Sequence, residues 1–178
     1  MTESITVHSI SELNIYKDKI VSNLNKCVNQ LREILAHNYS LEIFQVLKFE
    51  KCVTEPLSGN DENLIEVINQ SMTYGVSIMA VEYLYKIYSD QTFIINWGNI
   101  AGYDIQSEDG TIICECFAAT SYKNNKKLAT DLERLNNVDA NHKYEFFYDK
   151  EFGEKQKMIY QEKYPQIQIV KFEELIIL

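Results

Sequence analysis

The chain has 178 residues, 46% of them hydrophobic and only two of them proline, a composition that excludes a disordered chain and fits one domain with a sizeable core. Its formal net charge is −9, which on average repels nucleic acid. Neither a run of about 18 apolar residues nor a signal-peptide pattern is present, so we expect a soluble, cytoplasmic protein without a membrane partner. The four cysteines do not have zinc-cluster spacing and are expected to be reduced thiols.

The first half of the chain has mainly helical periodicity. Apolar residues recur every three or four positions from Ile10 to His37, which predicts a long first helix. The next segment, Leu41 to Val53, fits either a strand or a second helix. Residues 54–61 contain Pro and Gly and break the pattern, and Asn60 or Asp61 is expected to cap a helix that runs from about Glu62 to Tyr88.

The second half alternates between strand and helix patterns. The segments with these patterns, in chain order, are a strand at Thr92–Trp97, a hairpin around Asp109-Gly110, a helix at Asn125–Asn136, a strand at Lys143–Tyr148, a helix at Gly153–Tyr164 and a strand at Ile167–Phe172. In the helix at 125–136 the leucines share one face, with Asp131, Glu133 and Arg134 mainly outside it. The order from Glu62 onward is therefore helix, three strands, helix, strand, helix, strand.

Two acids in the predicted hairpin are the main candidates for function. Asp104 and Glu115 lie on opposite sides of the Asp109-Gly110 turn, so adjacent strands bring both carboxylates to one divalent cation. Glu115 alternates with Ile113 and Phe117, which predicts a partly buried acid, and such acids are usually paired or metal-bound. The competing explanations are a turn-initiating role for Asp104 and a solvent-facing pair.

The element order and these acids resemble the core of the PD-(D/E)XK, or restriction-endonuclease-like, nuclease superfamily. The residues that carry the resemblance are Asn63-Leu64-Ile65-Glu66, Gly102-Tyr103-Asp104-Ile105, Glu115-Cys116-Phe117-Ala118-Ala119-Thr120 and Asn124-Asn125-Lys126-Lys127-Leu128. The resemblance implies an α/β fold with a mixed central sheet flanked by helices and a core of the order αβββαβ. Residues 61–178 form that core, and residues 1–60 are an added N-terminal helical element of the same single domain.

One position departs from the superfamily pattern. Its third strand reads acid, any residue, lysine, whereas Glu115-Cys116 is followed here by Phe117, which carries no charge. In some members the lysine projects from the next helix instead. Lys127 is the preferred candidate there, while Lys123 and Lys126 stay open, and ordinary surface charge is the alternative for all three.

The resemblance also implies the chemistry of the site. Asp104 and Glu115 hold Mg²⁺, with Mn²⁺ as a substitute, the backbone carbonyl of Cys116 adds an oxygen, and Lys127 orients or activates the attacking water. Glu66, on the helix before the three strands, matches the position of an additional acid in many relatives. The alternative explanation for Glu66 and the polar residues on the same side of that helix is an ordinary solvent-exposed face.

The expected function is therefore metal-dependent endonuclease cleavage of DNA, in a restriction or defence context. A homodimer is a further expectation from the class, because cutting both strands calls for two sites and the N-terminal helix is available for pairing. The rival hypothesis is a nuclease-like fold that has lost catalysis and serves as a binding or regulatory module, which Phe117 and the acidic charge favour. A third hypothesis is a small cytoplasmic protein whose sheet has the same order of elements without any relation to these nucleases.

Overall fold

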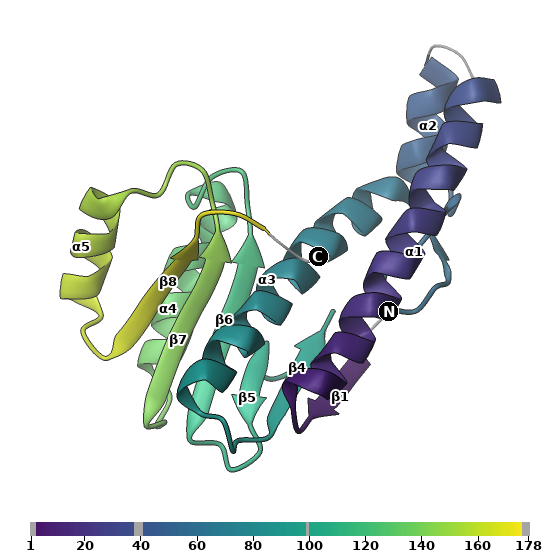
Figure 1. Cartoon of the computed structure of the whole chain (residues 1–178). Helices are drawn as coiled ribbons and strands as arrows, with labels where there is room; N and C mark the ends of the chain where they lie inside the picture. The colour runs from purple at the N-terminus through teal and green to yellow at the C-terminus, as the bar shows by residue number, and fades with distance from the viewer. Residues whose placement is uncertain (1–2, 38–40, 99, 176–178) are drawn as a thin grey trace.

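The computed structural model describes residues 3–37, 41–98 and 100–175, which form a mixed six-stranded sheet between two layers of helices (Figure 1). The strands are β1 (Glu3–Val7), β4 (Phe93–Trp97), β5 (Ile105–Ser107), β6 (Ile112–Ala118), β7 (His142–Tyr148) and β8 (Ile167–Phe172), in the spatial order β1-β4-β5-β6-β7-β8. The pairs β1–β4, β4–β5 and β5–β6 are antiparallel, and the pairs β6–β7 and β7–β8 are parallel. The predicted class, an α/β protein with a mixed central sheet, is confirmed.

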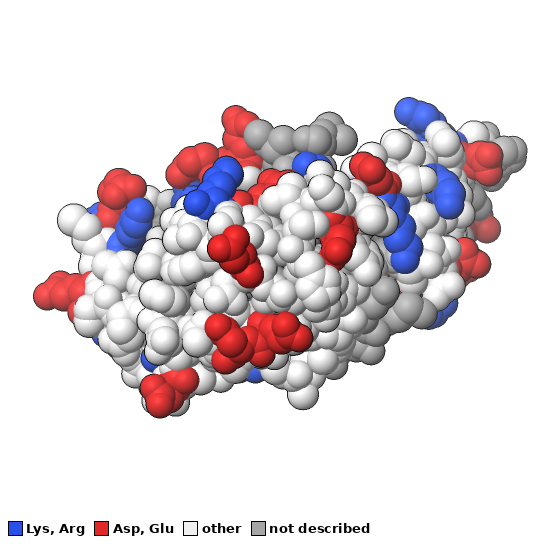
Figure 2. Space-filling view, turned by 60° about the horizontal axis from the view of Figure 1, so that its bottom comes forward, with Lys and Arg blue, Asp and Glu red and all other residues white. Residues whose placement is uncertain are grey.

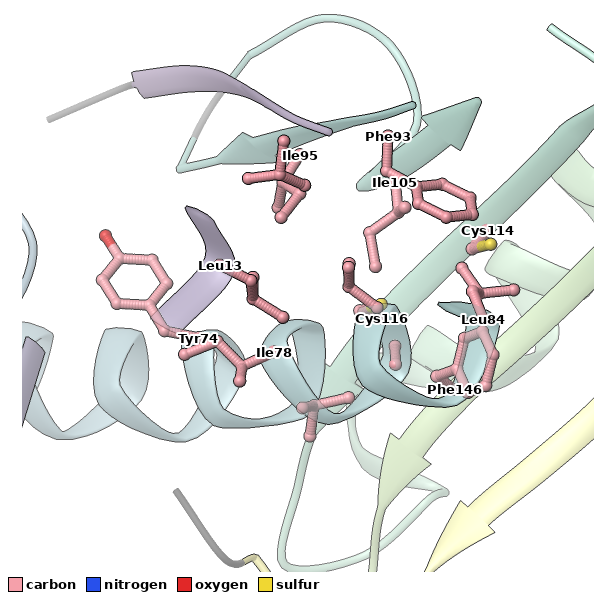
Figure 3. Close-up of a cluster of buried hydrophobic side chains, with 14 of the residues drawn as sticks. Leu13, Tyr74, Ile78, Leu84, Phe93, Ile95, Ile105, Cys114, Cys116 and Phe146 are labelled. Carbon is pink, nitrogen blue, oxygen red and sulfur yellow. The ribbon is translucent and has the colours of Figure 1, made fainter. Parts of the chain in front are cut away.

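Helices α1 (Ile10–His37) and α3 (Leu64–Ile87) cover one face of the sheet, and α4 (Lys127–Asn136) and α5 (Glu154–Lys163) cover the other. Figure 3 shows the core under α3, where Ile78 and Leu84 of the helix meet Phe93, Cys114 and Phe146 of three strands. No helix in the described ranges combines the length and apolar character that a bilayer span requires.

The N-terminal sixty residues do more than add helices. The strand β1 was not predicted, and it pairs with β4 at the edge of the main sheet, so this part of the chain contributes to the sheet itself. Helix α2 (Leu41–Phe49) follows α1 and resolves the ambiguity of that segment in favour of a helix. The short strands β2 (Val53–Thr54) and β3 (Asp61–Glu62) form a separate two-stranded sheet.

Two predicted helix starts were wrong by a few residues. Helix α3 begins at Leu64, and its cap is Asn63, whose side-chain oxygen accepts a hydrogen bond from the Glu66 N–H at 3.0 Å, because Asp61 is paired in β3. Helix α4 begins at Lys127. Asn125 and Lys126 have φ of 51° and 55° and end a 3-10 turn (Asn124–Lys126), so the helix cannot extend back through them.

Candidate functional site

The candidate site lies between the sheet and α4, on the face opposite to α3. Along β6, Cys114 and Cys116 face the α3 core, while Ile113 and Phe117 face the α4 core. Glu115 shares the face of Ile113 and Phe117, as predicted, which directs it toward α4, and its side chain is 1% exposed. In the parallel register Glu115 lies opposite Glu145 of β7, so two acids point to the same face from neighbouring strands.

Asp104 joins this face from the loop that precedes β5. The prediction of a β5–β6 hairpin is confirmed, with Gly110 at φ 71° in its turn, but Asp104 stands one residue before the strand. Its Oδ2 accepts a hydrogen bond from the backbone N–H of Cys116 at 2.7 Å. This bond fixes the Asp104 carboxylate beside β6, where the residue has a defined role beyond starting a turn.

The carboxyl groups of Asp104 and Glu115 lie within hydrogen-bonding reach of each other. Burial, and then the neighbouring Asp104 carboxylate, raise the pKa of Glu115 to about 8, although Arg134 works in the opposite direction. Two carboxylates this close cannot both be ionised at low cost. At neutral pH the pair therefore holds a proton, or it needs a cation between its oxygens.

Arg134 supplies a positive charge to this pair from α4. Its Nη1 lies 2.7 Å from Oε1 of Glu115, yet that oxygen has no partner with hydrogen-bond geometry among the described residues. The same guanidinium stacks on the Tyr103 ring at 4.6 Å and donates a hydrogen bond to the carbonyl of Gly102. Arg134 therefore ties the loop that carries Asp104 to helix α4.

Lys127 is the lysine that the fold brings to the acids. Its Nζ lies 2.9 Å from Oδ1 of Asp131, one helical turn further along α4. Burial alone would lower the pKa of Lys127, but Asp131, and then Asp104 and Glu115, raise it overall. Lys126 is exposed, and Lys123 is exposed with its Nζ over the ring of Tyr122 at 5.4 Å.

Sequence reasoning missed Glu145 and Asp131. Glu145 is fully buried, and neither of its carboxylate oxygens has a hydrogen-bond partner among the described residues. Burial, and then the nearby carboxylates of Asp131 and Glu115, raise its pKa well above the usual value. Asp131 was expected mainly outside the leucine face of its helix, but it is buried, with one oxygen on Lys127 and the other unpaired in the described part of the chain.

A signal for both residues was present in the sequence. Lys127, Asp131 and Arg134 are spaced four and three residues apart and therefore form one stripe beside the leucines of α4. Glu145 alternates with Lys143 and Phe147 in β7, just as Glu115 alternates in β6. What the sequence does not show is that β6 and β7 are neighbours in parallel register.

Several predicted site residues lie elsewhere or act differently. Glu66 is exposed in the first turn of α3, a helix on the other face of the sheet, so it does not join the acids. Cys116 meets Asp104 through its N–H, and its thiol faces the α3 core. Phe117 stacks on Phe147 with ring centroids 5.1 Å apart, so its side chain takes part in an aromatic contact.

The side-chain oxygens of this site are the type of ligand that a hard cation prefers, but they are too few to complete its coordination shell. Carboxylate oxygens are what Mg²⁺ prefers, and Oε1 of Glu115 lacks a hydrogen bond within the described residues. In the ranges that the structure describes, however, no three His, Cys, Asp or Glu side chains converge as a metal centre requires. A cation held here would therefore complete its shell with water and substrate oxygens.

A hollow of about 580 Å³ opens between α3 and the β6–α4 connection, and none of the four acids lines it. Its walls include Ile68, Met72, Asn124, Asn125 and Lys150. The β6–α4 connection that forms one wall continues directly into Lys127. The hollow and the acids are thus separate features that share this connection.

Comparisons with known proteins leave the class of the protein open, since no family model, no curated protein and no solved structure matches the chain.

Proposed function

We propose that the chain is a metal-dependent endonuclease with a restriction-endonuclease-like core. Its site for cleavage of DNA phosphodiester bonds would be formed by Asp104, Glu115 and Lys127. The carrying observation is the contact between the Asp104 and Glu115 carboxyl groups in a buried layer, with Lys127 from the following helix on the same face. The element order α3, β4, β5, β6, α4, β7 agrees with the core order of that superfamily.

The energetics of the acid pair support a cation site. A proton shared between the buried carboxyl group of Glu115 and the half-buried one of Asp104, or a cation between them, relieves the same repulsion. Among the described residues, the four carboxyl groups of Asp104, Glu115, Asp131 and Glu145 lie near the cationic side chains of Lys127 and Arg134. With one proton on Glu145 and another on the Asp104–Glu115 pair the charges balance, and a divalent ion would take the place of the proton on that pair.

Each residue has a defined part in the proposed reaction. A bound Mg²⁺ would lower the pKa of water and stabilise the charge that develops on the phosphate. Asp104 and Glu115 would hold the ion, and the Cys116 N–H keeps Asp104 in place. Lys127, oriented by Asp131, would place its ammonium beside the attacked phosphate. Arg134 would hold the loop that carries Asp104 against α4.

Specific observations favour the rival function, an inactive nuclease-like binding module. Arg134 already offers Glu115 a positive charge at 2.7 Å, and Phe117 offers none. Figure 2 shows lysines and arginines scattered among acidic residues on the face that it draws, with no continuous basic surface among its described residues. Such a surface contributes little to the sequence-independent attraction of nucleic acid.

The test compares cleavage and metal binding in matched variants. The parent is incubated with linear and supercoiled DNA in Mg²⁺ or Mn²⁺, beside Asp104→Asn, which keeps an oxygen for the Cys116 N–H, and Asp139→Asn, an exposed acid in a loop. We expect cleavage by the parent and the Asp139 variant and a loss of at least about 100-fold in Asp104→Asn. Equal cleavage by all three proteins would contradict the proposal. An inert parent that binds no Mn²⁺ in a titration would leave the binding module as the function.

A further inference from the structure

The hollow between α3 and the β6–α4 connection lies at the edge of the sheet where two parallel strands end. Ala118 and Tyr148 are the last residues of β6 and β7, they are paired in the parallel register, and both line the hollow. Figure 1 shows the arrowheads of β6 and β7 at this common edge. In α/β proteins, small ligands bind outside the carboxyl ends of parallel strands, and the hollow of about 580 Å³ is within the size range of such sites.

Part of the lining is apolar although it is open to solvent. Ile68 and Met72 of α3 are 47% and 41% exposed, and Ala118, Ala119 and Tyr148 at the strand ends line the hollow with them. When a flat apolar group enters between such side chains, both lose contact with water, and this favours binding. The lining therefore suits a ligand with an apolar, preferably planar, part.

The polar part of the lining both donates and accepts hydrogen bonds. Asn69, Asn124 and Asn125 line the hollow. The Asn124 side chain donates to Oγ1 of Thr120 at 2.9 Å, whereas the side chains of Asn69 and Asn125 make no hydrogen bond within the described part of the chain. A side-chain amide carries one acceptor and two donors, a combination that complements the edge of a nucleobase.

Lys150 gives the lining its positive charge. It is exposed and forms no ion pair with any residue that the structure describes. Its neighbours in sequence are Asp149, which is buried, and Glu151, which accepts a hydrogen bond from the Ser121 hydroxyl at 2.7 Å. In a chain with a net charge of −9, an unpaired ammonium group beside an apolar hollow favours an anionic ligand.

The backbone of the β6–α4 connection is held in an uncommon conformation at this hollow. Asn125 and Lys126 have φ of 51° and 55°, in the left-handed region that Asn tolerates better than Lys. Lys126 is exposed and has no ion pair among the described residues, so no such contact of its own side chain accounts for the strain. Strained residues of this kind cluster at ligand sites, and here one of them lines the hollow itself.

We propose that the hollow binds one nucleotide unit, with its base against the apolar side chains and the asparagine amides and its phosphate at Lys150. A nucleotide uses all three parts of the lining, since its base has apolar faces and hydrogen-bonding edges and its phosphate is anionic. An acyl chain would leave the amides without partners, and inorganic phosphate would leave the apolar side chains uncovered. The inference goes beyond the proposed nuclease function and does not rest on it, because the acids of that site do not line the hollow.

The first test measures binding without cleavage. The full chain is titrated in EDTA, by isothermal titration calorimetry, with the four nucleoside monophosphates, their nucleosides and ribose 5-phosphate. EDTA removes divalent ions, so the result is independent of any nuclease activity. We expect the best nucleotide to bind at least about 10-fold more tightly than its nucleoside and than ribose 5-phosphate. Ribose 5-phosphate that binds as tightly as the best nucleotide, or dissociation constants above about 10 mM for all four nucleotides, would overturn the inference.

The second test separates the phosphate contact from the base contact. Lys150→Gln should weaken nucleotide binding about 10-fold and leave nucleoside binding unchanged, because it removes only the charge. Asn69→Ala combined with Asn125→Gly removes both amides, keeps the left-handed backbone accessible, and should weaken nucleotide and nucleoside alike by about 10-fold.

The matched control for these variants is Lys86→Gln, which removes an exposed lysine at the other end of α3 and should leave binding unchanged. All the substituted side chains are exposed, so the fold is expected to persist, and circular dichroism checks this. Nucleotide binding equal to that of the parent, in either Lys150→Gln or the double asparagine variant, would overturn the inference.

A third arm identifies the source of the nucleotide. A single-stranded oligonucleotide of about ten nucleotides is titrated under the same conditions into the parent and into Lys150→Gln. A strand that binds more tightly than the free nucleotide, and is weakened by Lys150→Gln, assigns the hollow to an unpaired nucleotide of a strand. A strand that binds no more tightly than the free nucleotide assigns it to the free nucleotide.

Discussion

The two faces of the sheet differ in what their side chains do. Toward α3, residues of β4, β5, β6 and β7 form a continuous apolar layer, with Cys114 and Cys116 as its only sulfur groups on β6. Toward α4, the same strands β6 and β7 place Glu115 and Glu145 between aromatic and aliphatic neighbours. One face is thus composed for stability, while the other carries buried charge that reduces stability, and such costs concentrate where a protein has a function.

The largest expected effect belongs to the apolar face. Phe146 of β7 is fully buried and stacks on Tyr144 and Phe172. Phe146→Ala should lower the free energy of unfolding by about 3–5 kcal/mol, because it removes buried area and leaves a cavity. Chemical denaturation measures this change, with Met158→Ala on the exposed side of α5 as the control. A loss below about 1 kcal/mol would mean that this face is not the stabilising one.

On the face of the sheet that carries the acids, a substitution is expected to raise the free energy of unfolding instead of lowering it. In the folded protein Glu145 keeps its proton at a pH where the unfolded chain, with the usual pKa of 4.5, has released it. Stability therefore falls as pH rises above about 4.5, and Glu145→Gln removes this penalty. The variant should be about 1–3 kcal/mol more stable than the parent at pH 7, and equal to it below pH 4.5. A less stable variant at pH 7 would show that the Glu145 carboxylate has a favourable partner.

Added Mg²⁺ should change the pH dependence that comes from Glu115. Its raised pKa makes the free energy of unfolding fall between about pH 4.5 and 8, since the folded state holds the proton that the unfolded state loses. A divalent ion favours the ionised pair, so thermal unfolding should show a gain of about 1–2 kcal/mol from Mg²⁺ at pH 8 and little gain at pH 5. The gain should vanish in Glu115→Gln. An equal effect of Mg²⁺ at both pH values would argue against binding at this pair.

The smallest effect is expected at Lys127. Its ion pair with Asp131 joins a half-exposed ammonium to a buried carboxylate, so solvent screens part of the interaction. Lys127→Gln should lower the free energy of unfolding by about 1 kcal/mol, whereas Lys171→Gln, whose partner Glu173 is 81% exposed, should change it by less than about 0.5 kcal/mol. A double-mutant cycle with Asp131→Asn measures the pair. A coupling energy near zero would mean that Asp131 does not hold Lys127 in solution.

The long elements of this fold could be predicted because their signals are local. The apolar periodicity of α1 and α3, the Asp109-Gly110 turn and the alternation in β6 all act within a few residues. Strand β1 escaped prediction, since five residues carry little pattern and it becomes a strand only by pairing with β4, far along the chain. The helix starts were missed because Asp61 was already paired and Asn125 takes a left-handed conformation.

The candidate site, too, has features that local sequence signals predicted and features that only long-range contacts decided. The sequence alone determined that Asp104 and Glu115 flank one hairpin turn, that Glu115 is at least partly buried, and that candidate lysines lie at or near the start of the next helix, because short-range geometry dictates each of these. Only the tertiary structure decided that Glu145 lies opposite Glu115, that Asp131 is buried, that the exposed Arg134 reaches Glu115, and that Glu66 does not take part. The parallel pairing of β6 with β7 and the choice of face for each helix depend on contacts between distant parts of the chain.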